Sequence, residues 1–164
     1  MDALATYLED HRSGALGAVE LLEALERRKD GSEAARFAAD ILDRVRQDVE
    51  VLDRLIEVIG DHNRLKEAAA WVAQKVAHLK LPGLGDDELG VFESLEALGL
   101  GILGKRALWE ALARTAPHDP RLAGFDYDAL IRRAEEQFEL VNARRLRMAL
   151  AVFVPQARER AHKP

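Results

Sequence analysis

Four polar residues interrupt the apolar stripes of four long amphipathic segments, and their types could do chemistry. His11, Asp48, Lys105 and Arg145 stand where a repeat of three and four residues favours apolar side chains. Burying a charge is costly unless the charge is paired and hydrogen-bonded, so we expect these groups to meet one another. They could form a charged network that fixes helix register. Alternatively, the carboxylates and His11 could bind a metal or a small ligand.

Heights along a bundle of four helices sort the polar candidates into two layers. The first layer consists of His11, Asp48, Lys105 and either Gln137 or Glu136. The second layer, farther along the bundle, consists of Glu20, Glu96 and Arg144. In the first layer we expect Asp48 to accept hydrogen bonds from His11 and Lys105. We assign no catalytic residue in either layer.

The stretch LGLGILGKRALW, residues 98–109, matches two phosphate-binding patterns, G-x-G-x-x-G and G-x-x-x-x-G-K. A phosphate loop needs a strand before it and an exposed turn that opens a helix. The preceding residues, ELGVFESLEAL, have a helical period instead. Arg106 also stands where a Ser or Thr would hold magnesium. We therefore predict an uninterrupted helix here and no bound nucleotide.

The glycines of this stretch have a structural interpretation. Ala97, Gly101 and Gly104 share one side of their helix, and Gly14 and Gly17 form a similar small face on the first helix. Glycine inside a helix costs up to about 1 kcal/mol, which tight packing would have to offset. We therefore expect two backbones to approach closely at these faces, either within the bundle or across a homodimer.

Apolar periodicity predicts four long helices that position these residues. Their approximate ranges are 3–29, 33–59, 88–116 and 126–154, with Asp86 or Asp87 capping the third. A shorter helix, about 63–79, lies in the long connection 60–87. We expect one domain over residues 1–155 and a polar tail over 156–164. Strand signals such as sustained alternation are missing, so the fold class is all-α.

The long middle connection lets the second and third long helices run parallel, and in this the chain resembles the ferritin-like four-helix bundles. The alternative is an up-down-up-down bundle with the middle helix packed as a lid. The segments TYLEDHRSGALGAVEL, AWVAQKVAHLKL and SLEALGLGILGKRALW are also similar to an uncharacterised family of small bacterial helical proteins. Ferritin-like di-iron sites use a Glu-x-x-His motif on each of two helices. None of the long helices predicted here carries that motif.

Composition excludes several classes of function. The chain has 164 residues, no cysteine and a net charge of −5, which argues against thiolate metal sites and nucleic-acid binding. The first residues do not resemble a signal peptide, and no apolar run is long enough for a membrane span, so we expect a cytoplasmic protein. We predict a non-enzymatic structural or binding module with a buried charged network, and we expect it to form a homodimer. The alternative is an iron- or manganese-binding protein with redox or storage activity.

Overall fold

The computed structural model describes residues 2–27, 33–60 and 87–154, and these ranges are almost entirely helical. The four long helices are α1 (Ala3–Glu26), α2 (Glu33–Ile59), α4 (Glu88–Thr115) and α5 (Tyr127–Phe153). Two short 3-10 helices, η1 (Ala116–His118) and η2 (Pro120–Leu122), connect α4 to α5. The described residues contain no strand, which confirms the all-α prediction. The helix predicted at 63–79 and the tail 156–164 lie outside the described residues.

Aspartates begin three of the helices. The side chains of Asp2, Asp87 and Asp126 each accept a hydrogen bond from a backbone N–H in the first turn of α1, α4 and α5. Such a cap supplies an acceptor for one of the N–H groups that the first turn leaves unpaired. The prediction of Asp86 or Asp87 as the cap of α4 is thereby resolved in favour of Asp87.

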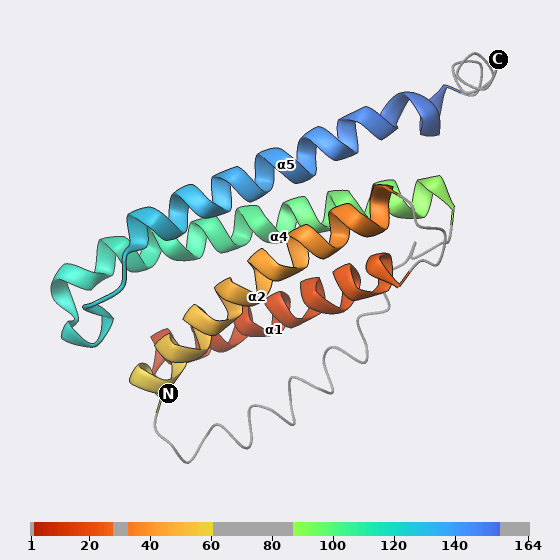
Figure 1. The fold of residues 1–164 in the computed structure, drawn as a ribbon. Helices are drawn as coiled ribbons and strands as arrows, with labels where there is room; N and C mark the ends of the chain where they lie inside the picture. Colours follow the sequence, from red (N-terminus) through yellow and green to blue (C-terminus); the bar gives the residue numbers. More distant parts are fainter. Residues whose placement is uncertain (1, 28–32, 61–86, 155–164) are drawn as a thin grey trace.

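The four helices form two antiparallel hairpins, α1 with α2 and α4 with α5 (Figure 1). The directions follow from ion pairs that join the helices. The pairs are Arg12–Asp53 and Arg46–Glu23 between α1 and α2, Arg133–Asp48 and Arg144–Glu33 between α2 and α5, and Arg106–Glu135 and Arg145–Glu96 between α4 and α5. In each set, the residue number rises along one helix as the number of its partner falls along the other, so the two helices are antiparallel. Since α2 and α4 are each antiparallel to α5, α2 and α4 run in the same direction.

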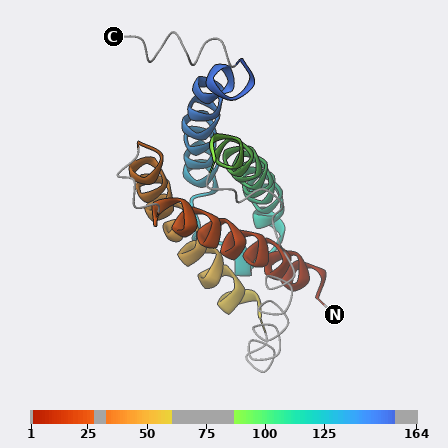
Figure 2. The same ribbon diagram turned by 90° about the vertical axis from the view of Figure 1, so that its right-hand side faces the viewer.

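The core lies between the two hairpins, whose axes are inclined to one another in Figure 2. Leu8, Leu22, Leu55, Leu98 and Trp109 are among its largest fully buried side chains. Full burial of one such side chain stabilises the fold by about 1.5–3 kcal/mol. In the described ranges, none of the helices combines the length and the apolar character that a membrane crossing requires.

Candidate ligand pocket and its charged cluster

A buried charged cluster joins three helices near the middle of the bundle. Asp48 on α2 is only 4% exposed and accepts a hydrogen bond from Lys105 Nζ on α4. Gln137 on α5 is fully buried, accepts from Lys105 Nζ through Oε1, and donates from Nε2 to Asp48 Oδ2 over 2.9 Å. Arg133 on α5 forms an ion pair with the other carboxylate oxygen, Oδ1. We call these four residues the Asp48 cluster.

The Asp48 cluster carries more positive than negative charge. One carboxylate faces the Lys105 ammonium and the Arg133 guanidinium, which gives the cluster a net charge of +1 when all three are ionised. Burial lowers the pKa of Lys105, Asp48 opposes that shift, and the nearby Arg133 adds to it. The pairing with Asp48 thus compensates only part of the cost of burying the ammonium.

The Asp48 cluster adjoins a pocket of about 440 Å³ between α1, α2 and α4. We call it the α1–α4 pocket. Asp48 and Lys105 line it, and most of the remaining wall is apolar. The remaining wall consists of Tyr7, Asp10, His11, Gly14, Ala15 and Ala18 from α1, Val45, Val49 and Leu52 from α2, and Leu98, Gly101, Ile102, Gly104, Leu108 and Trp109 from α4. The pocket lies within the range of roughly 300–1,000 Å³ that small-molecule sites occupy.

Three glycines of the predicted small faces, Gly14, Gly101 and Gly104, line this pocket and do not bring the described helices into close contact. A Cβ built at Gly14, Gly101 or Gly104 would meet no atom of the described residues within 4 Å. The prediction of close backbone approach inside the bundle is therefore wrong at these three positions. The physical reason is that α1 and α4 leave a space where the missing side chains would have stood. The stretch from Gly99 to Lys105 is helix throughout, as predicted.

His11 lies in the pocket wall but does not join the Asp48 cluster. Its ring packs edge-to-face against Tyr7, with ring centroids 4.6 Å apart. Within the described residues no hydrogen bond joins His11 to Asp48, contrary to expectation: Lys105 and Gln137 bond Oδ2 of that carboxylate, and Arg133 forms the ion pair with Oδ1. Burial lowers the pKa of His11, while Asp10 opposes the shift.

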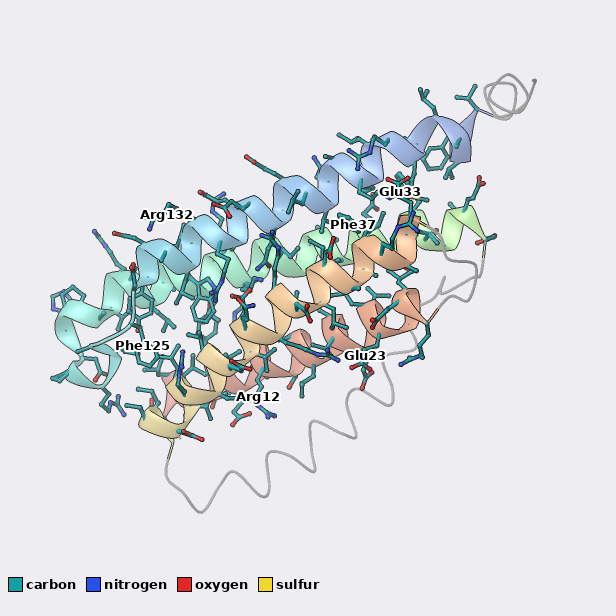
Figure 3. The ribbon with its side chains drawn as sticks, viewed as in Figure 1. Arg12, Glu23, Glu33, Phe37, Phe125 and Arg132 are labelled. Atoms are coloured by element: carbon teal, nitrogen blue, oxygen red, sulfur yellow. The ribbon has the colours of Figure 1, made fainter. Side chains whose placement is uncertain are left out.

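The second predicted layer is not assembled. Glu20 is exposed, and Glu96 accepts a hydrogen bond from Arg145 over 3.0 Å on the outer side of α4 and α5. Arg145 also lies 5.4 Å from the centre of the Phe92 ring. Arg144 instead pairs with Glu33, at the start of α2 (Figure 3). Glu96 and Arg144 reach partners near solvent, and Glu20 is itself exposed, so nothing requires these groups to meet in the interior.

Adjacent residues on α5 face opposite environments. Glu136 is exposed, whereas Gln137 is the buried member of the first layer, which resolves the alternative left open by the sequence. In the same way the Arg132 side chain lies on the outer side of α5 (Figure 3), whereas Arg133 reaches Asp48. The sequence analysis did not identify Arg133. Its position one helical turn before Gln137 is a signal that could have found it.

The described residues do not assemble a recognisable metal centre. No group of three or more His, Asp or Glu side chains in these ranges is placed to hold a metal ion. Asp48 shares its oxygens with cationic side chains, and a nearby cation opposes binding of a second one. The arrangement is better suited to orienting a small molecule than to coordinating iron or manganese.

A comparison with protein families, curated proteins and solved structures finds no significant match to this chain. The four-helix arrangement therefore rests on the described helices alone, and no family is assigned to the chain.

Proposed function

We propose that this chain is a non-enzymatic binding module with ferritin-like topology, and that its α1–α4 pocket holds a small, largely apolar ligand. The topology is supported by the common direction of α2 and α4, which one long connection allows. The binding function rests on one observation: Gly14, Gly101 and Gly104 leave open space beside a buried charged cluster. Glycines inside a helix lower its stability, and these three do not allow close packing in return. A ligand site would account for their presence.

The chemistry of the pocket favours binding over catalysis. Its polar groups are the side chains of Tyr7, Asp10, His11, Asp48 and Lys105 and the indole N–H of Trp109. Asp48 and Lys105 are bonded to each other, and this pairing favours the protonated lysine, which has no lone pair with which to act as a nucleophile. In this proposal the Asp48 cluster fixes the relative register of three helices and serves as the polar floor of the pocket.

A fluorescence titration with the apolar dye N-phenyl-1-naphthylamine tests the proposal. Gly104→Leu would fill the pocket, because the Gly104 position has free space in front of it. The matched control is Ala107→Leu, which places the same side chain at an exposed position of α4 outside the pocket wall. We expect wild type and Ala107→Leu to bind the dye and Gly104→Leu to lose it. Equal binding by all three proteins would contradict the proposal.

Native mass spectrometry of untagged protein, with elemental analysis of the same sample, tests the competing occupants. A co-purified organic molecule that is absent from Gly104→Leu supports the pocket. Stoichiometric iron or manganese would favour the metal-binding alternative. A dimer that Gly104→Leu converts to monomer would show that the glycine faces bind a second copy of this chain, and the ligand proposal would fall.

A further inference from the structure

The two most buried charged groups of the α1–α4 pocket, Asp48 and Lys105, lie together, whereas its other polar side chains, Tyr7, Asp10 and His11, lie nearer solvent and the rest of its wall is apolar. Lys105 and Asp48 provide the floor, and Gly14, Gly101 and Gly104 are among the small residues of the walls. Such a division suits a molecule with one polar end and an apolar body. The donors, the acceptors and the charge at the floor then define which polar end fits.

The floor has a donor to spare and few acceptors. An ammonium group has three N–H donors, and Lys105 uses two of them, one on Asp48 and one on Gln137. The side chain of Lys105 is 15% exposed and lines the pocket, so its third N–H can serve a ligand. Asp48 is already shared by Lys105, Gln137 and Arg133, so a donor from the ligand would compete with these three groups.

The charge of the Asp48 cluster also indicates which polar end of a ligand would fit. The Asp48 cluster has one carboxylate between two cations, so one further negative charge would neutralise it. Asp10 lies at an exposed position of the pocket wall, and His11 is half-buried beside it. An anionic group at the mouth would approach the Asp10 carboxylate, whereas an anionic group at the floor would approach Lys105. The favourable position for a negative charge is therefore the buried end.

Resting on the proposed binding function, we propose that the ligand is a monocarboxylate with an apolar chain, held with its carboxylate at Lys105 and its chain along the glycine faces. A charge-assisted hydrogen bond from an ammonium to a carboxylate is about twice as strong as one between neutral groups. The apolar chain supplies the rest of the affinity through burial in the pocket. No bond is made or broken, so the site binds its ligand without turnover.

Isothermal titration calorimetry with three ten-carbon probes tests the proposal. The probes are decanoate, decanol and decylammonium, which share a chain and differ in the charge of the head group. We expect wild type to bind decanoate about tenfold more tightly than decanol, and decylammonium most weakly, because a hydrogen bond to a charged group contributes about 1.5–3 kcal/mol.

Two variants locate the head group. Lys105→Met removes the free donor and one positive charge while Arg133 and Gln137 remain on Asp48, so the preference for decanoate should disappear. Arg106→Met is the matched control, because Arg106 is the next residue on α4 but pairs with Glu110 and Glu135 outside the pocket. It should keep the tenfold preference. If Lys105→Met does not fold, the wild-type probe series still decides.

The outcomes separate this inference from the function on which it rests. If decanol binds wild type as tightly as decanoate, and Gly104→Leu blocks both, the pocket is real but the carboxylate assignment is wrong. A preference for decylammonium, or one for decanoate that survives in Lys105→Met, also overturns the assignment. If no probe binds, or if Gly104→Leu binds all of them as wild type does, the proposed function itself fails.

Discussion

Two levels of the bundle place charged residues in the predicted stripes, and they use them differently. At the Asp48 level, α2, α4 and α5 each contribute a polar side chain to one cluster, and Asp48 is 4% exposed. At the Glu96 level, Arg145 pairs with Glu96 and Arg144 pairs separately with Glu33. The Glu96 side chain is 55% exposed. The comparison shows that a stripe position becomes part of a network where three helices enclose it. Where solvent can reach it, a single partner is enough.

The largest expected difference between the levels is in stability. Asp48→Ala should lower the free energy of unfolding by about 3–5 kcal/mol, because it leaves the largely buried Lys105 and the partly buried Arg133 without their counter-ion. Glu96→Ala should cost less than about 1 kcal/mol, since exposed ion pairs contribute little. Urea denaturation of both variants measures the two losses. Equal losses would mean that the two levels do not differ in the way described.

Each level also contains one side-chain amide, Gln137 at the Asp48 level and Asn142 at the Glu96 level. Gln137→Leu should cost about 1–3 kcal/mol, because it removes an acceptor from Lys105 and a donor from Asp48 at a fully buried position. Asn142 is the matched amide at the other level, where it accepts hydrogen bonds from Arg145 at a half-buried position. Asn142→Leu should change stability by less than about 0.5 kcal/mol. A larger loss for Asn142→Leu than for Gln137→Leu would reverse the ranking of the levels.

The glycines beside the Asp48 cluster give a smaller effect of opposite sign. Gly104→Ala should raise the free energy of unfolding by up to about 1 kcal/mol, because alanine is the better helix former and its Cβ would meet no atom within 4 Å among residues 2–27, 33–60 and 87–154. Gly124 is the control, since it lies in the connection between η2 and α5 with φ +91°. Gly124→Ala should lower stability, because a side chain strains that conformation. A destabilised Gly104→Ala would restore the close approach that the sequence predicts. Equilibrium unfolding in urea measures both changes.

The sequence predicted much of the fold because the helices signal themselves locally. Periodicity gave bounds for α2 that the structure reproduces, and the height argument placed Asp48, Lys105 and Gln137 at one level, where they meet. The sequence also identified the faces of small residues, but it did not show that three of their glycines border a pocket. Whether Gly104 closes a contact or opens a pocket depends on the distance between α1 and α4, and that distance is a property of the whole packing.

Orientation within a level was the other limit. Residue spacing fixes the direction of a side chain only to within a fraction of a helical turn, so it could not choose between Glu136 and Gln137. It also could not show that Lys105, Gln137 and Arg133, and not His11, would be the partners of Asp48.

The pH dependence of stability tests whether His11, which was predicted at the height of Asp48, also interacts with the Asp48 carboxylate. Burial holds the pKa of folded His11 below its ordinary value of 6.5. The unfolded chain then binds more protons than the folded one between these two pKa values, so the contribution of His11 to stability is complete above pH 6.5 and falls as the pH is lowered. Urea denaturation of wild type and His11→Gln at about pH 8 and about pH 5 isolates this contribution.

We expect wild type to lose more stability than His11→Gln on acidification, by less than about 1 kcal/mol. The neighbouring Asp10 carboxylate favours the protonated ring and keeps the effect small. A hydrogen bond from His11 to Asp48, as the sequence suggested, would raise the histidine pKa and reverse the sign. Wild type would then gain stability relative to His11→Gln as the pH falls. The sign of one difference therefore tells whether the carboxylate of Asp48 serves three partners or four.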